Sequence, residues 1–67
     1  MYTWEIEKFL VEHNRTITIE EFYKIINKVA NPQIKDVTYD STYSRYNIET
    51  DDGKVMEVFV KNRRDTV

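Results

Sequence analysis

Few side chains in this 67-residue sequence are of the types that carry catalysis or metal binding. His13 is the only histidine, the residue type that most often serves as a general acid or base. A general base needs an orienting partner and a cleft, and a domain this small has little room for one. We interpret His13 as a partly buried histidine that ends a helix. One histidine without any cysteine cannot form a structural zinc site. We therefore expect a non-enzymatic protein with no catalytic residues, no metal and no cofactor.

A second candidate is the acidic run Asp51-Asp52-Gly53, with Glu49 nearby. Three carboxylates could hold a divalent cation weakly, but Asp-Asp-Gly is the composition of a hairpin turn. We favour the turn. Gly53 is the only glycine, so a glycine-rich phosphate-binding loop is excluded.

Composition predicts one small folded domain over residues 1–67, with 40% hydrophobic and 33% charged side chains. We expect a cytoplasmic protein without membrane contact. No apolar run approaches the roughly 20 residues of a membrane-spanning helix, no signal peptide opens the chain, and cysteine is missing. The net charge of −2 argues against direct binding to nucleic acid. Residues 1–52 carry ten acidic and six basic side chains, whereas residues 53–67 carry two acidic and four basic ones, so the tail is basic.

The clearest local pattern predicts a helix over residues 19–30. Thr18 and Glu21 have the spacing of a capping box, and Ile17 and Phe22 that of a hydrophobic staple. Pro32 stops the helix, because a residue before proline avoids the α conformation. One apolar stripe follows helical periodicity through Ile19, Phe22, Ile25, Ile26 and Val29.

An earlier helix begins at a Thr3 cap and stops near Asn14, which tolerates a left-handed conformation. Trp4 and Val11 lie off its apolar stripe, which consists of Tyr2, Ile6, Phe9, Leu10 and His13. The short connection 15–17 predicts that the two helices pack as a hairpin.

After Pro32 the periodicity changes to two, which predicts strands at 33–40, 43–50 and 54–61. A turn at 40–42 joins the first two strands, with Tyr39 opposite Ser44 and Val37 opposite Tyr46. A three-residue turn at 51–53, with a bulge at Gly53, joins the last two. Strand parity then pairs Ile48 with Met56, Tyr46 with Val58 and Ser44 with Val60.

The predicted fold is α+β, with the order ααβββ: a two-helix hairpin on one face of a three-stranded antiparallel meander. The last strand is expected to be an edge. No segment remains to cover the other sheet face, which carries Asp36, Thr38, Tyr43, Arg45, Asn47, Glu49, Val55, Glu57, Phe59 and Lys61. We expect partner binding by this face and the adjoining turn, through Asp36, Tyr43, Arg45, Glu49, Asp51, Asp52, Val55, Glu57 and Phe59.

The sequence leaves three hypotheses for how the protein binds a partner. The favoured one is a protein contact or a homodimer centred on Val55 and Phe59, since apolar side chains rimmed by charge are typical of interfaces. The alternative is single-stranded nucleic acid stacked on Tyr43 and Phe59. A third is imitation of a phosphate backbone by the carboxylates Glu5, Glu7, Glu12, Glu20, Glu21, Asp36, Asp40, Glu49, Asp51 and Asp52.

The succession WEIEKFLVEHN, TITIEEFYKIIN, NPQIKDVTYD and YNIETDDG resembles small accessory proteins of phages and prophages of Gram-positive bacteria. This resemblance implies a host-takeover factor in the cytoplasm of an infected or lysogenic bacterium, which binds and inhibits one host protein. Some proteins of that kind occupy the DNA-binding surface of the nucleoid protein HU, so the implied partner includes basic nucleic-acid-binding proteins. The resemblance assigns no functional residue.

Overall fold

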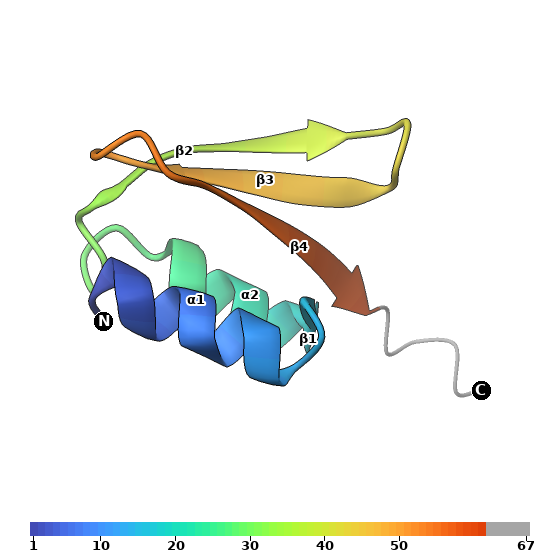
Figure 1. Ribbon diagram of the computed structural model, residues 1–67, viewed down its shortest axis with the longest axis horizontal. Helices are drawn as coiled ribbons and strands as arrows, with labels where there is room; N and C mark the ends of the chain where they lie inside the picture. Colours follow the sequence, from blue (N-terminus) through green and yellow to red (C-terminus); the bar gives the residue numbers. More distant parts are fainter. Residues whose placement is uncertain (62–67) are drawn as a thin grey trace.

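The computed structural model describes residues 1–61, which form two helices and four strands. Both helices lie on the same side of the sheet and run in opposite directions (Figure 1). The α+β class is therefore confirmed, but the order ααβββ omits one strand. The elements are α1 (Thr3–Glu12), β1 (Thr16–Thr18), α2 (Ile19–Ile26), β2 (Ile34–Asp40), β3 (Arg45–Thr50) and β4 (Val55–Lys61).

The omitted strand, β1, lies where the sequence predicted only a connection between helices. It pairs in parallel with the end of β4, placing Ile17 opposite Val60, and the Phe59 amide donates to the Arg15 carbonyl at 2.7 Å. The preceding residues Asn14 and Arg15 both have positive φ, 53° and 58°, which turns the chain from α1 into β1. The sheet order is β1-β4-β3-β2. The prediction that the last strand is an edge is therefore wrong.

The β3–β4 hairpin has the predicted register through most of its length. Ile48 lies opposite Met56 and Tyr46 opposite Val58. Gly53 has φ 86° and donates to the Thr50 carbonyl at 2.9 Å, as the three-residue turn requires. The predicted Ser44–Val60 pair is wrong, because β4 leaves β3 after Val58 to pair with β1.

The loop of the first hairpin is longer than the sequence predicted. Its turn occupies residues 41–44, with Ser44 at φ 54°, so Val37 lies opposite Ile48 and Tyr39 opposite Tyr46. The predicted register is wrong by two residues. A shift of two keeps every side chain on its face, and the assignment of faces therefore survives the error.

The core lies between the helices and one face of the sheet. It consists of Ile6, Leu10, Ile17, Phe22, Ile25, Ile34, Ile48, Met56 and Val58, all of them buried. At about 25 cal/mol per Å² of apolar area removed from water, a fully buried aliphatic or aromatic side chain stabilises the fold by about 1.5–3 kcal/mol. Each of the two helices and four strands contributes at least one residue to this cluster.

The capping box at the start of α2 is confirmed. The Glu21 amide donates to the Thr18 hydroxyl at 3.1 Å, and the Thr18 amide donates to the Glu21 carboxylate at 2.8 Å. The bond from the Thr18 amide is the main reason that the pKa of the Glu21 carboxyl lies below its usual range. Ile17 and Phe22, the predicted staple, are both buried.

The predicted end of α2 is wrong, because the helix stops at Ile26 rather than at residue 30. Asn31 is buried and ends the helix: its side-chain amide donates to the carbonyls of Lys24 at 3.2 Å and Ile25 at 2.9 Å. Its own oxygen accepts from the Met1 ammonium group at 2.7 Å. Val29, assigned to the apolar stripe, is 93% exposed as a result.

The N-cap of helix α1 lies one residue earlier than predicted. Tyr2 is the N-cap and its amide donates to the Glu5 carboxylate at 2.7 Å, so Thr3 is the first helical residue and not the cap. Ile6 and Leu10 are buried as predicted, whereas Tyr2 and His13 are exposed. Trp4 and Val11, expected off the stripe, are both exposed.

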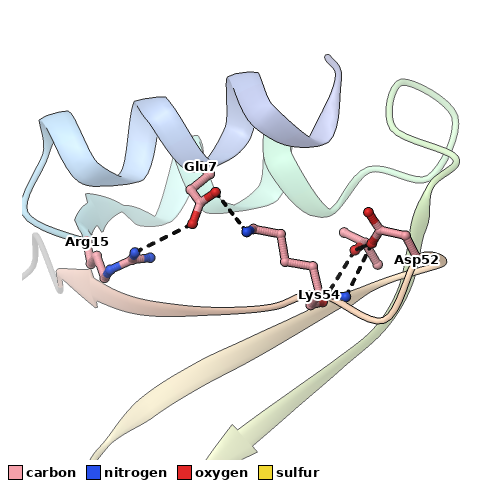
Figure 2. Close-up of polar contacts among 5 residues, drawn as sticks. Glu7, Arg15, Asp52 and Lys54 are labelled. Carbon is pink, nitrogen blue, oxygen red and sulfur yellow. Dashed lines mark hydrogen bonds and ion pairs between the residues drawn. The ribbon is translucent and has the colours of Figure 1, made fainter.

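An ion-pair cluster links α1 to the sheet beside the first half of β4, where β1 does not reach. Glu7 lies between two cations, 2.9 Å from Lys54 Nζ and 3.9 Å from an Arg15 guanidinium nitrogen (Figure 2). Charged side chains at an unpaired strand edge hinder the addition of a foreign strand. Glu7 therefore protects this part of β4.

We expect Phe22→Ala and Ile25→Ala each to lower the free energy of unfolding by about 2–5 kcal/mol, since each leaves a cavity in the core. Val29→Ala should change it by less than about 0.5 kcal/mol, because an exposed position loses no packing. Urea denaturation measures all three. A loss for Val29→Ala comparable to that for Ile25→Ala would show that the helix continues beyond Ile26.

Asn31→Asp should cost about 1–3 kcal/mol of stability, because it removes the donors that satisfy a buried carbonyl of Ile25 and a partly buried one of Lys24 at the end of α2. The matched control is Asn27→Asp. The side-chain oxygen of Asn27 accepts from the Val29 amide at 2.9 Å, and an aspartate oxygen can accept the same bond. Thermal unfolding of both variants compares the same chemical change at two positions. Equal melting temperatures would contradict the capping role of Asn31.

Candidate interaction surface

The sheet face opposite the helices, here called the open face, has no covering element within residues 1–61 (Figure 1). Strand parity and the observed register place on it Asp36, Thr38, Asp40, Arg45, Asn47, Glu49, Val55, Glu57, Phe59 and Lys61. Tyr43, in the β2–β3 turn, lies against Arg45. Seven of the nine predicted partner-binding residues are therefore brought together.

At the end of the open face beside the β2–β3 turn lies an arginine held by its neighbours. Arg45 lies 3.3 Å from the Glu57 carboxylate on β4 and 3.9 Å from the Asp40 carboxylate on β2. Its guanidinium carbon lies 4.6 Å from the centre of the Tyr43 ring, a cation–π arrangement. The sequence placed Arg45 on this face but did not reveal the two ion pairs, because they depend on the register of both hairpins. Arg45 is thus already neutralised.

One cross-strand row of the open face concentrates negative charge. Asp36 lies opposite Glu49, which lies opposite Val55 on the next strand. Like charges at directly opposite positions of a sheet are destabilising. None of the ion pairs found within residues 1–61 involves Asp36 or Glu49. This row is therefore suited to a cationic group from a partner.

The apolar part of the open face lies on β4. Val55 is 57% exposed and Phe59 is 37% exposed, with Glu57 between them on the same side of the strand. Phe59 lies opposite Thr16 of β1, so it stands over paired strands and not at an outer edge. The face therefore offers two apolar side chains with carboxylates around them, rather than a continuous apolar patch.

The structure does not bring Asp51 and Asp52 into the open face. Both lie in the β3–β4 turn, where the Thr50 hydroxyl and the Lys54 amide donate to the Asp52 carboxylate. The bond from Thr50 is the main cause that holds the pKa of Asp52 below its usual range. Asp52 also lines a shallow depression on the helix side with Tyr2, Trp4 and Glu7. The turn interpretation of this acidic run is confirmed.

The wider set of carboxylates does not gather on one surface. Glu5 and Glu21 receive the amides of the two helix caps, and Glu7 pairs with Lys54 and Arg15. Among the carboxylates of residues 1–61, only Asp36, Asp40, Glu49 and Glu57 share the open face. The basic tail after Lys61 lies outside the described residues.

His13 is exposed rather than partly buried. Its Nδ1 lies 2.8 Å from the Phe9 carbonyl oxygen, and its ring centre lies 4.1 Å from that of Phe9. The nitrogen donates to a carbonyl at the end of α1, so the side chain caps the helix. This contact gives His13 a structural role.

No known protein family, curated protein or solved structure matches the chain significantly. Within residues 1–61, neither helix is long and apolar enough to span a membrane.

Proposed function

We propose that this protein is a non-catalytic interaction module that binds a basic host protein through the open face and inhibits it. The observation that carries the proposal is the Asp36–Glu49–Val55 row. Two opposed carboxylates without a cationic partner cost stability in the free protein, and a cation from a partner would relieve their repulsion.

The side chains beside this row favour a protein as the partner. Val55 and Phe59 offer apolar contact, and Val55 lies directly beside the carboxylate of Glu49 in the same row. An interface of this kind combines apolar anchors with electrostatic complementarity. The resemblance to phage accessory proteins suggests a host nucleoid protein such as HU as the first partner to test, within the bacterial cytoplasm.

Binding of single-stranded nucleic acid is the alternative, and the exposed rings of Tyr43 and Phe59 favour it. The charge of the face opposes it, because the face carries four carboxylates but only two cations, Arg45 and Lys61, and Arg45 is already paired. Imitation of DNA is the narrower form of the main proposal. Its support is confined to the open face, since Glu5, Glu7 and Glu21 on the helix side are engaged in caps and ion pairs.

Titration of the protein with purified HU from a Gram-positive bacterium, followed by calorimetry at low salt, tests the proposal. We expect saturable binding that Glu49→Lys weakens at least about tenfold, because a favourable charge contact becomes a repulsive one. Glu12→Lys makes the same charge change on the exposed helix side and should leave the affinity within about twofold.

Three results would contradict the proposal. They are absence of binding, equal effects of the two lysine variants, and tighter binding of a mixed 12-nucleotide single strand than of HU. The last result would support the alternative, especially if that affinity fell steeply with salt.

A further inference from the structure

The two outer strands of the sheet are β1 and β2, and they differ in their capacity to accept another strand. β1 has three residues, whereas β2 has seven. Short edge strands are poor templates for strand addition, and long ones are good templates unless they are protected. β2 is therefore the edge that matters for assembly.

The backbone groups that β2 presents outward follow from the alternation of an antiparallel ladder. The Thr50 amide donates to the Lys54 carbonyl, so Thr50, Ile48 and Tyr46 turn their backbone groups toward β4. The remaining residues of β3 then bond to β2. These pairs are Glu49 with Asp36, Asn47 with Thr38 and Arg45 with Asp40. The N–H and C=O groups of Val37 and Tyr39 are left pointing away from the sheet.

Val37 and Tyr39 differ in how available their outward backbone groups are to another strand. The Val37 amide donates to the Asp36 carboxylate at 2.9 Å, and a bulge between Ile34 and Asp36 distorts the same end of the strand. Bulges and charged side chains are the usual protection of an edge. Tyr39 has no such protection, because the charge of the neighbouring Asp40 is already paired with Arg45. The unprotected part of the edge is thus the C-terminal half of β2.

The Tyr39 side chain is also only partly packed. It projects to the helix side of the sheet, where its ring centre lies 4.9 Å from that of Tyr46, which in turn lies 4.6 Å from Phe22. Tyr39 nevertheless remains 55% exposed. Tyr39 is the outermost of these three rings and stands beside unpaired backbone groups. Its ring could therefore bury more area against an added strand.

We propose that β2 pairs with β2 of a second copy, antiparallel and about a two-fold axis at Tyr39. Such an axis stands perpendicular to the sheet, so residues that face each other across it lie on the same side. The axis must then pass through a single residue, and the chemistry of the edge selects which one.

The other positions of the axis are unfavourable. An axis at Val37 needs the Val37 amide for its central bonds, but Asp36 already accepts from that amide. An axis at Thr38 places Asp36 opposite Asp40 of the partner subunit, and an axis at Asp40 places two copies of Asp40 opposite each other. Directly opposed carboxylates are destabilising.

The axis at Tyr39 avoids these conflicts. The two Tyr39 rings face each other, and Thr38, whose hydroxyl can donate, faces Asp40 of the partner subunit. Val37 faces Ser41 of the partner subunit and can accept with its free carbonyl. Only a few residues overlap, so the interface is small and we expect a weak dimer with micromolar affinity. It joins the two sheets and leaves both open faces on one side.

The first experiment is analytical ultracentrifugation of the wild type and of charged variants at residue 39. The wild type should dimerise with rising concentration. Tyr39→Lys and Tyr39→Glu should each remain monomeric, and an equimolar mixture should form a heterodimer, because the two side chains face each other. Val55→Lys changes an exposed apolar residue of the open face and should dimerise like the wild type.

The second experiment uses the absence of cysteine from the sequence. In a hydrogen-bonded antiparallel pair the two Cα atoms lie about 5.5 Å apart, within the range of a disulfide. Oxidised Tyr39→Cys should therefore form a covalent dimer much faster than Val55→Cys.

The proposal is overturned if the wild type stays monomeric up to millimolar concentration or if the lysine–glutamate mixture stays monomeric. It is also overturned if Val55→Lys alone abolishes the dimer, which would place the contact on the open face. None of these results depends on a host partner, so this inference and the proposed function can fail separately.

Discussion

The parallel pairing of β1 with the end of β4 is the constraint on which the rest of the structure depends. This pairing covers three residue pairs and is anchored by the bond from the Phe59 amide to the Arg15 carbonyl. To reach this position the chain adopts left-handed conformations at both Asn14 and Arg15, which costs free energy for non-glycine residues. Burial of Ile17 against the core offsets that cost.

This pairing also decides which surfaces stay available. β4 becomes an inner strand, so Phe59 stands within the sheet and only the first half of β4, beside Glu7, keeps an unpaired edge. β2 is left as the long outer strand on the other side. The open face and the β2 edge therefore have separate roles in this account: the first for a partner of opposite charge, the second for another copy of the chain.

Much of the fold follows from local signals in the sequence. The Thr18–Glu21 box and the parity of β3 and β4 predicted one helix start and one hairpin register, because each depends on residues close in sequence. β1 was missed since it has only three residues, the last of which is the α2 cap, and so short a strand carries no periodic signal. The end of α2 was missed because Asn31 satisfies its carbonyls from outside the helix.

The candidate surface was predictable in outline only. Parity alone placed Asp36, Arg45 and Phe59 on one face, and an error of two residues in the first register left that result unchanged. The sequence indicated in part which carboxylates are unavailable to a partner, because the glutamate of a capping box already accepts a bond from the cap amide. The ion pairs of Arg45 and the exposure of Tyr39 depend on the three-dimensional register, which the sequence does not fix.

Amide hydrogen exchange within β4 tests the central claim most directly. The ladder turns the amides of Phe59 and Glu57 to the same side of β4. Of these two residues, only Phe59 lies opposite a residue of β1. The Phe59 amide should therefore exchange much more slowly than the Glu57 amide, and a short distance between the backbone protons of the two strands should be visible by NMR. Equally fast exchange at both positions would show that β1 does not pair with β4, and the account of the fold would be wrong.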